Sequence, residues 1–585
     1  MRRSYFPKLL TLDWLRQAYL SGGLTPEALM GEIIARAEET REKNIWIIEP
    51  SEAFILPYIK RLGRMDFSEK PLWGVPFAIK DCLDLKGAPT TAACPAFSYQ
   101  PAEDAEAVRR LLAAGAVPVG KTNMDQFATG LVGTRSPYGE VHNAFDDERI
   151  SGGSSSGSAV AVALGQSVFS LGTDTAGSGR VPAALNNLVG YKPAVGAWPS
   201  KGMVPACASL DCVALFANNA ADALEISRLL RGKCDEDCRS REIPYKENQR
   251  PRALCVPREL PAFFGDYGEA YQEAWKRAVD NLGRLGLAVE EVDVSLFQEA
   301  AKILYDGPYI AERWSALGGF VEKNPQAVFP VTRKILESGK GEQYSAAMLF
   351  STLSQLEAYK LQVRKLLKDA MLILPTAGGT FTRAQVDADP IATNSRMGLY
   401  TNHCNLLDLC AVALPSGFAG ENLPFGVTAF ALSANEGMLG WLAPRYERLW
   451  KETTAFAVCG LHMRGFPLEY QLTEAGGSFI KETRTAPCYR MYRLKGAPER
   501  PGLVRQAAGG ASVAVELWNL PAEGLGALLA KTAPPLGFGT VELADGSKAL
   551  GFLCEGFAAG TAEDITAAGG WRAYREGQKE TAGRP

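Results

Sequence analysis

From residue 72 onward, short apolar runs alternate with segments of helical periodicity, and this alternation narrows the possible folds more than any other feature of the chain. The runs GVPFAIKD, AVPVG and FSLGTD are each followed by a turn, and helical patterns such as AEAVRRLLAAG and SAVAVALG lie between them. Strands that alternate with helices are typical of a sheet covered by helices. We therefore expect an α/β fold with its chemistry at strand ends.

The length of 585 residues exceeds the size at which one hydrophobic core stops growing, so we expect more than one domain. The first domain is expected over residues 1–450, with a helical lead-in over about 1–65. Further on, SVAVELWNL and GTVELADGSKALGFLCE indicate short strands with glycine-rich turns. Residues 451–585 are therefore predicted to form a small C-terminal domain of α+β or β type.

Charge and composition argue against nucleic-acid and membrane partners. The chain has 62 lysine and arginine residues and 65 acidic residues, which gives a net charge of -3. This charge produces no overall electrostatic attraction for a polyanion or a lipid surface. The N-terminal apolar residues are interrupted by Lys8, Asp13 and Arg16, which is untypical of a signal peptide. The 12 cysteines lack metal-site spacing. We expect a cytoplasmic protein with reduced thiols and no metal.

The stretch ISGGSSSGSAVAVALG, residues 150–165, is the most informative for chemistry. Its many glycines and serines have little side chain to pack, so the loop is suited to close backbone approach. A flexible linker is one alternative, but linkers are not followed at once by an alanine- and valine-rich helix. A phosphate-binding loop is another, but the lysine and the glycine spacing of such loops are missing.

A candidate nucleophile follows about twenty residues later. Ser178 lies between two glycines in GTDTAGSGRVPAA, just after the apolar run FSLGTD, which is a geometry that exposes a serine hydroxyl. The usual histidine base is missing from the pattern, because none of His142, His403 and His462 stands in a recognisable triad context. A lysine must be considered instead.

Lys80 is the candidate base, because it ends the apolar run GVPFAIK. Burial removes the solvation of an ammonium group, so its pKa falls from about 10.4 and the neutral amine can accept a proton. The alternative is a structural ion pair, for example with the neighbouring Asp81.

These motifs, GVPFAIKD, SGGSSSGS and GTDTAGSGRVPA in this order, resemble the amidase-signature family over about residues 70–220, and more loosely to about residue 440. The resemblance implies a mixed central sheet covered by helices and hydrolysis of an amide bond. It also implies that Lys80 is the base, that Ser154 bridges it to the nucleophile Ser178, and that the peptide bond before Ser154 is cis.

The resemblance assigns roles to the neighbouring residues too. Backbone N–H groups of Thr175, Ala176 and Gly177, with that of the nucleophile, are expected to stabilise the oxyanion. Gly153 and Ser155 are assigned to the substrate-binding side of the loop, with Ser155 as a hydrogen bonder. Asp174 and Arg180 are expected to hold the nucleophile loop in place.

Further sequence matches to one group within this family suggest the substrate specificity. Ala176 replaces the glycine of many members, and LYDGPYIAERW, ILPTAGGTFT and ADPIATNSRMGLYTNHCNLLDL also resemble the allophanate hydrolases. There, the positions of Tyr305 and Arg313 hold the substrate carboxylate, and a spacing of eight residues lets both face one side of a helix. The alternative is that Tyr305 is core and Arg313 solvated.

Some positions depart from the pattern of that family, so the resemblance does not predict the shape of the substrate pocket. They are Gly378 and Gly379 in place of a proline-containing turn, Tyr191 and Ala194, and His403.

The tail, about 455–575, resembles the C-terminal domain of allophanate hydrolases, which has a γ-glutamyl cyclotransferase-like fold, through GLHMRGFPLEYQL, VELWNLP and PPLGFGTVELADG. This implies that the tail processes the carboxylated carbamate released by the first domain. His462 is its only histidine and is our candidate catalytic residue there. A non-catalytic dimerisation module is the alternative.

The resulting hypothesis is hydrolysis of allophanate to ammonia and carbon dioxide by a homodimer without metal or organic cofactor, with urea carboxylase as pathway partner. The first alternative is an amidase of another small carboxylated amide. Others are one component of a tRNA amidotransferase, which would lack this tail, and a catalytically inactive binding protein, which the presence of all three triad residues argues against.

Overall fold

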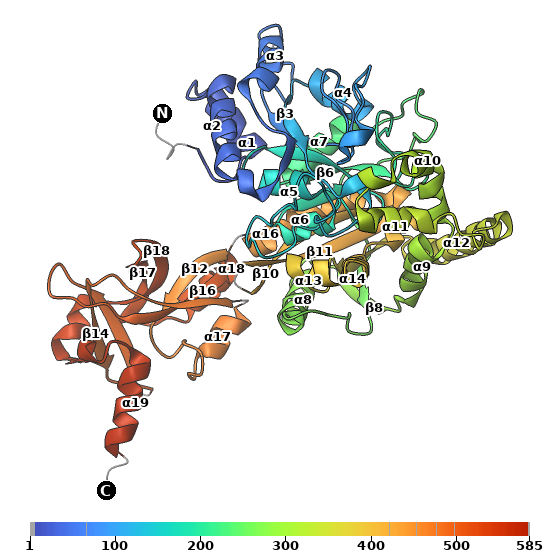
Figure 1. The fold of residues 1–585 in the computed structure, drawn as a ribbon. Coiled ribbons are helices and arrows are strands. Elements are labelled where there is room, and N and C mark those ends of the chain that lie inside the picture. Colours follow the sequence, from blue (N-terminus) through green and yellow to red (C-terminus); the bar gives the residue numbers. More distant parts are fainter. Residues whose placement is uncertain are drawn as a thin grey trace. The chain divides into compact units, whose positions relative to one another are not determined.

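The computed structural model describes residues 6–65, 67–420, 422–451, 453–475, 477–496 and 498–582. The chain divides into two compact units, Met1–Glu447 and Arg448–Pro585 (Figure 1). The first five residues, part of the N-terminal segment used in the signal-peptide argument, lie outside the described residues. Over those ranges, no helix has both the length and the apolar character needed to cross a membrane.

The first unit is built on one sheet of 11 strands. In spatial order they are β1 (Trp46–Ile48), β3 (Val117–Thr122), β2 (Pro76–Lys80), β4 (Phe169–Asp174), β6 (Cys212–Ala217), β5 (Val189–Lys192), β10 (Leu409–Gly420), β11 (Leu423–Leu432), β9 (Ala370–Pro375), β7 (Ala253–Pro257) and β8 (Ala288–Val292). Strand β2 is parallel to β3 and β4, and β7 to β8 and β9, whereas the other pairs are antiparallel. The predicted α/β class with a mixed sheet is confirmed.

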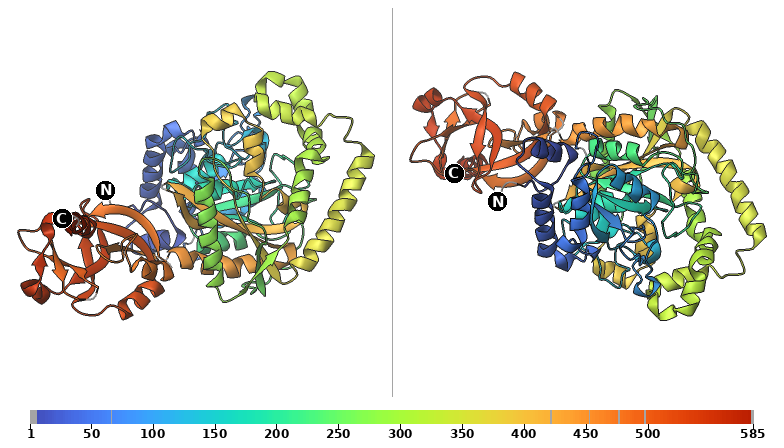
Figure 2. Two further views of the ribbon diagram at one scale, coloured as in Figure 1. Left: turned by 90° about the horizontal axis from the view of Figure 1, so that it is seen from below. Right: turned by 90° about the horizontal axis from the view of Figure 1, so that it is seen from above.

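Helices flank this sheet (Figure 2). They are α1 (Leu12–Leu20), α2 (Pro26–Glu39), α3 (Glu52–Leu62), α4 (Glu106–Ala113), α5 (Ser156–Ala163), α6 (Val181–Leu185), α7 (Ala220–Leu230), α8 (Gly268–Gly283), α9 (Ser295–Asp306), α10 (Tyr309–Lys323), α11 (Pro330–Ser338), α12 (Ala346–Leu366), α13 (Arg383–Ala388), α14 (Ala392–Met397), α15 (His403–Leu406) and α16 (Gly437–Lys451). Every residue of α5 is buried, and α5 packs on β2, β3 and β4. Its small side chains permit this close packing on the sheet.

The register of β2 against β4 positions the end of each strand. The rings of Phe77 and Phe169 stack with centroids 5.3 Å apart, and Ile79 is paired with Leu171. All residues of both strands are buried, so a slip by one residue would turn their side chains to the wrong face. Lys80, the last residue of β2, is thereby fixed beside the end of β4.

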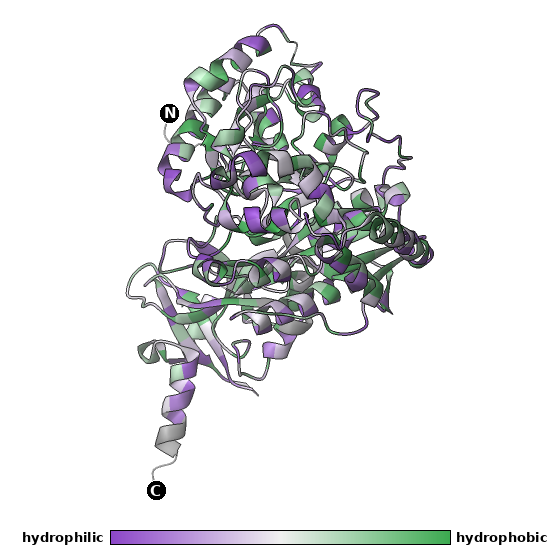
Figure 3. Cartoon of the chain, turned by 45° about the vertical axis from the view of Figure 1, so that its right-hand side comes forward, coloured by the Kyte–Doolittle hydropathy of each residue, from purple (hydrophilic) through white to green (hydrophobic). Residues whose placement is uncertain are grey.

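Over its described residues, the second unit holds two sheets and three α-helices. Its strands are β13 (Ser478–Arg484), β16 (Ala514–Pro521), β12 (Thr453–Val458), β18 (Lys548–Cys554) and β17 (Leu536–Glu542) in one sheet, and β15 (Arg500–Arg505), β14 (Tyr489–Leu494) and β19 (Glu563–Asp564) in the other. Its helices are α17 (Glu469–Glu474), α18 (Ala522–Ala530) and α19 (Trp571–Ala582). A core that includes Met491, Val515 and the fully buried Trp571 joins the two sheets. Figure 3 shows hydrophobic stretches along the strands of the chain.

Candidate active site

Lys80 lies at the centre of a buried cluster of hydroxyl groups. Its Nζ is 2.8 Å from Ser154 Oγ, 3.0 Å from Ser155 Oγ and 2.7 Å from Thr173 Oγ1. The side chain is 0% exposed, and no carboxylate of the described residues forms an ion pair with it. Thr173 is a partner that the sequence motifs do not reveal, because it becomes a neighbour only through the pairing of β2 with β4.

Burial lowers the pKa of the Lys80 ammonium, because the charged form loses its hydration. Negative charges at Asp125, Asp211 and Asp174 oppose this effect at longer range. A neutral amine offers two N–H donors and one lone pair. Ser155 and Thr173 can accept the two hydrogen bonds, which leaves the lone pair for the proton of Ser154.

The hydrogen-bond chain continues from Lys80 to Ser178, because Ser154 Oγ lies 2.9 Å from Ser178 Oγ. The peptide bond between Gly153 and Ser154 is cis. A Cβ on Gly153 would lie 2.0 Å from Asp125 Oδ2, so only glycine fits there. The three groups form a continuous path along which hydroxyl protons can move, since hydroxyl groups rotate to suit their partners.

The whole glycine- and serine-rich loop is packed into the interior. Every residue from 150 to 162 is buried. This burial is incompatible with a flexible linker, which would be solvated.

Ser178 follows β4 and precedes α6, on a short loop that requires glycine. Gly177 has φ +154°, and a Cβ there would lie 2.3 Å from Thr401 Oγ1. In the described structure, the N–H groups of residues 175–178 donate no hydrogen bond to protein acceptors. They are therefore available to an oxygen that arrives with a ligand.

Asp211 fixes the start of this loop. It accepts a hydrogen bond from Thr175 Oγ1 and two more from the backbone N–H groups of Ala206 and Cys207, at 2.7 and 2.9 Å. Burial raises the pKa of Asp211 to about 6, whereas these hydrogen bonds and the charge of Arg313 act in the opposite direction. No sequence motif points to Asp211.

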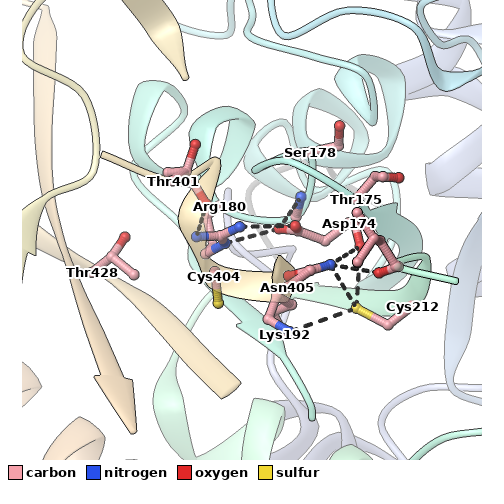
Figure 4. A network of polar contacts seen from close by, with 12 residues as sticks. Asp174, Thr175, Ser178, Arg180, Lys192, Cys212, Thr401, Cys404, Asn405 and Thr428 are labelled. Carbon is pink, nitrogen blue, oxygen red and sulfur yellow. Dashed lines mark hydrogen bonds and ion pairs between the residues drawn. The ribbon is translucent and has the colours of Figure 1, made fainter. Parts of the chain in front are cut away.

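Asp174 and Arg180 form the base of the loop (Figure 4). The guanidinium donates two bonds to the carboxylate, both at 2.9 Å, and the Gly179 N–H donates a third at 2.9 Å. Asn405 Nδ2 donates to the backbone oxygen of Asp174 at 2.8 Å. A bidentate pair of this kind is geometrically specific, and it holds the loop as the sequence analysis expects.

Asp125 is a further residue that the sequence analysis missed. Its carboxylate accepts hydrogen bonds from the N–H groups of Val132, Gly133 and Arg135, at 3.3, 3.1 and 2.9 Å. The N–H of Asp125 donates to the oxygen of Ser154 at 3.1 Å. Asp125 thereby ties the segment 130–135 to the cis peptide.

The prediction that one helix carries Tyr305 and Arg313 is wrong. Tyr305 is in α9 and Arg313 in α10, because Pro308, which has no N–H, and Gly307 separate the two helices. The side chains still meet, with the guanidinium 5.5 Å from the centre of the Tyr305 ring. Tyr305 packs in the same apolar cluster as Ala176, which brings this pair next to the loop that carries Ser178.

Arg313 is not the solvated helix residue of the alternative interpretation. It is 1% exposed, its NH1 is 3.4 Å from Thr129 Oγ1, and its Nε lacks a partner in the part of the chain described. Within the same residues it forms no ion pair. A buried guanidinium that no carboxylate contacts directly is costly, and it offers a bidentate site for an anionic ligand.

A second buried arginine lies close by. Arg135 donates to the backbone oxygens of Thr129 and Pro390, at 2.9 and 2.5 Å. Burial lowers the pKa of Arg135, the charge of Asp125 acts in the opposite direction, and the charge of Arg313 lowers the pKa further. Two buried guanidinium groups, those of Arg135 and Arg313, thus contact Thr129.

The positions that depart from the family pattern have structural explanations. His403 packs between the rings of Phe297 and Phe430, and burial lowers its pKa to about 3, so it fills an apolar position as a neutral ring. A Cβ on Gly378 or Gly379 would lie 2.4 or 2.2 Å from a backbone oxygen. These glycines therefore allow close approach of the segment 262–264.

Tyr191 and Ala194 are also explained. The Tyr191 hydroxyl donates to Glu436 at 2.8 Å, and the N–H of Ala194 donates to the same carboxylate at 3.1 Å. Both residues therefore serve to anchor Glu436 rather than to line a ligand site.

His462 belongs to the second unit and lies at a separate cavity. Its Nε2 is 3.0 Å from Gln471 Oε1, and its ring stacks on Phe552 with centroids 4.7 Å apart. Burial lowers the pKa of His462. Across the described ranges, no group of three or more His, Cys, Asp or Glu side chains is arranged to hold a metal ion.

Comparison with known proteins gives a family match for each of the two units. Residues 32–439 match the model of the amidase family, and residues 454–576 match that of the allophanate hydrolase C-terminal domain. The allophanate hydrolase of Kluyveromyces lactis has a similar structure, with a TM-score of 0.70 and 36% identity over 97% of this chain and 100% of that one.

Two relatives show how far the similarity extends. The urea amidolyase of Saccharomyces cerevisiae is 38% identical over 96% of this chain, but the chain spans only 33% of its length. One component of the glutamyl-tRNA(Gln) amidotransferase of Deinococcus radiodurans is 32% identical over 75% of this chain and 96% of its own length. The chain therefore belongs to the amidase family and carries, in addition, an allophanate hydrolase C-terminal domain.

Proposed function

We propose that this chain hydrolyses allophanate, with Ser178 as nucleophile, Ser154 as proton relay and Lys80 as base. The observation that carries the proposal is the continuous buried path from Lys80 Nζ through Ser154 Oγ to Ser178 Oγ, with steps of 2.8 and 2.9 Å. Similarity to the allophanate hydrolase of Kluyveromyces lactis supports the choice of substrate.

The reaction starts when Ser178 Oγ attacks the amide carbonyl. As the new C–O bond forms, the proton of Ser178 passes to Ser154 Oγ, whose own proton passes to the lone pair of Lys80. The tetrahedral intermediate collapses by breaking the C–N bond, and the relay returns a proton to the leaving nitrogen, so ammonia departs. Water then repeats the cycle on the acyl-enzyme and releases the carboxylated carbamate.

The N–H groups of Thr175, Ala176 and Gly177, with that of Ser178, stabilise the oxyanion in this scheme. Their lack of protein acceptors in the described residues supports this role. Donors that are already oriented need no reorganisation when the charge develops, and one such donor contributes about 10²–10³-fold to kcat. Asp211 keeps Thr175 in position through the hydroxyl group.

Arg313 binds the carboxylate of allophanate, with Tyr305 beside it. The buried guanidinium without an acidic partner in the described structure supports this assignment. Gly153 and Ser155 form the wall of the site on the side of the cis peptide. Because allophanate carries one carboxylate and simple amides carry none, this contact selects between them.

The C-terminal domain takes the carboxylated carbamate as its substrate, with His462 as its catalytic residue. There the bond between nitrogen and one carboxylate breaks, its electron pair stays on nitrogen, nitrogen takes up a proton, and carbon dioxide leaves. The remaining carbamate decays to ammonia and carbon dioxide. The match to the allophanate hydrolase C-terminal domain and the half-buried position of His462 support this step.

The chain also acts as a homodimer in this proposal, and a urea carboxylase supplies its substrate. Helix α12 exposes an apolar row, Leu349, Phe350 and Leu353, which are 39%, 68% and 41% exposed, and such a row is suited to a second copy of the chain. The similarity to urea amidolyase supports the link to urea carboxylation.

Ammonia release from allophanate, malonamate and simple amides tests the proposal. We expect strong preference for allophanate, and loss of activity in Ser178→Ala. Ser170→Ala is a matched control, because Ser170 is a buried serine of β4 that donates to the backbone oxygen of Ser158. Equal activity on simple amides would remove allophanate as the substrate.

The second candidate function is hydrolysis of another small carboxylated amide, with a non-catalytic, dimerising C-terminal domain. Arg313 favours it as much as it favours allophanate hydrolysis, because the guanidinium reads only the carboxylate. Preference for malonamate over allophanate in the same assay would select this alternative.

A further inference from the structure

The second unit contains a cavity of about 240 Å³ whose lining combines His462 with two cations. It is bordered by the loop 459–462 after β12, by Arg500 at the start of β15, by Lys531 at the end of α18 and by Phe552 of β18. A volume of this size admits a molecule of a few heavy atoms. The cavity is therefore suited to a small ligand.

His462 lines this cavity with a neutral imidazole. The side-chain oxygen of Gln471 can only accept, so Nε2 of His462 carries the proton of that hydrogen bond. Burial lowers the pKa of His462, and the positive charge of Arg500 lowers it further. The ring is thus neutral, with the lone pair on Nδ1.

The positive charges of the cavity are not compensated by protein acids. In the described residues, neither Arg500 nor Lys531 forms an ion pair, and no Asp or Glu is among the residues that line the cavity. The nearest acid in sequence, Glu499, is already paired with Arg493 at 3.0 Å and Arg575 at 3.2 Å. Two cations, a neutral imidazole and no acid make an anion site.

We propose that Arg500 and Lys531 bind the two carboxylates of a small dianion and hold it against His462. This inference rests on the proposed function, in which the carboxylated carbamate is the substrate of this domain. That molecule has one carboxylate at each end of a single nitrogen, so each cation can meet one end by a charge-assisted hydrogen bond. The dianion also raises the pKa of His462, since negative charge favours the imidazolium.

Histidine NMR of the full chain tests this proposal, because the protein has only three histidines. Malonate is the probe. It has a CH₂ group in place of the nitrogen of the carboxylated carbamate, and it does not lose carbon dioxide at neutral pH and room temperature. We expect malonate to shift the ¹³Cε1 signal of His462 in a saturable way and to raise its pKa. The signal is assigned from its loss in His462→Gln.

Arg500→Gln and Lys531→Gln are each expected to weaken malonate binding at least about tenfold, as the loss of a charge-assisted hydrogen bond requires. Arg505→Gln is the matched control, because Arg505 lies on the same strand, is paired with Glu542 and does not line the cavity. Malonamate, with one carboxylate, should bind more weakly than malonate.

The proposal is overturned if the His462 signal does not respond to malonate, or if both cation variants bind it as well as the unchanged chain. Its failure is distinguishable from that of the proposed function. If the unchanged chain binds malonate but His462→Gln releases the second ammonia at the normal rate, the anion site is retained and the catalytic role of His462 is removed. If His462→Gln releases the second ammonia more slowly but the unchanged chain does not bind malonate, the catalytic role of His462 is retained and the anion site is removed.

Discussion

The amidase site and the C-terminal cavity differ in how firmly they hold their functional groups. Lys80, Ser154 and Ser178 are all buried, and Lys80 alone has three hydroxyl partners. In the second unit, Arg500 and Lys531 are exposed, and His462 is held by one hydrogen bond and one stacked ring. The proposed functions account for this difference, because covalent catalysis on a stable amide needs aligned groups, whereas a dianion that decays readily needs little more than charge and enclosure.

The largest effect should come from breaking the proton path. We expect Lys80→Met to lower kcat by about 10³–10⁴-fold, since the base is lost while the volume is kept. In the unchanged enzyme, kcat/KM should rise with pH, because the lowered pKa lets the neutral amine form below the ordinary lysine range. The pH–rate profile measures both.

Lys192→Met is the control for that variant. Lys192 is also fully buried, on β5, but its amine contacts the backbone oxygen of Pro193 at 2.8 Å and not the serines. The rise of kcat/KM with pH should persist in Lys192→Met. A pH rise that survives in Lys80→Met would contradict the assignment of the base.

The second-largest effect is expected from loss of the contact between Arg313 and the substrate carboxylate. Arg313→Gln is expected to raise KM for allophanate by about 10²-fold and to leave the slow hydrolysis of simple amides unchanged, because the lost contact is made only by the carboxylate. Steady-state kinetics on both substrates measures this. Arg364→Gln, an exposed arginine of α12, is the control. Equal losses on both substrates would mean that Arg313 serves the fold instead.

A smaller effect is expected from the support of the nucleophile loop. Asp211→Asn keeps one acceptor oxygen but weakens the hold on Thr175 and on the N–H groups of Ala206 and Cys207. We expect kcat to fall about tenfold with KM nearly unchanged, because the oxyanion donors are less well oriented. A rise in KM alone would place Asp211 with substrate binding.

The smallest effect belongs to the C-terminal unit. His462→Gln should leave the first ammonia from each allophanate unchanged and delay the second by several-fold, because the carboxylated carbamate also decays in solution. A rapid-mixing time course of ammonia release separates the two phases. Identical time courses in the two proteins would show that His462 does not accelerate the second step.

The two regions also differ in how much the sequence predicts. Lys80, Ser154 and Ser178 lie in three contiguous motifs, each at the end of an apolar run or in a glycine-rich loop, so their proximity could be expected. Thr173 and Asp211 join them only through strand pairing and loop packing. The break between α9 and α10 was missed because helical spacing was followed across Gly307 and Pro308.

The C-terminal cavity is harder to predict for a physical reason. Arg500, Lys531 and His462 come from a strand, a helix end and a loop far apart in sequence, and none stands in a motif. An exposed cation has no local sequence signature, because surface arginines and lysines are common. Only the folded chain brings these three around one cavity.

Trapping the acyl-enzyme tests whether Ser178 is the nucleophile. The enzyme is mixed with allophanate, quenched in acid within milliseconds, digested, and analysed by peptide mass spectrometry. We expect a covalent acyl group on the peptide that contains Ser178, and its absence in Ser178→Ala, which also loses ammonia release. An acyl group on another residue, or full ammonia release by Ser178→Ala, would contradict it.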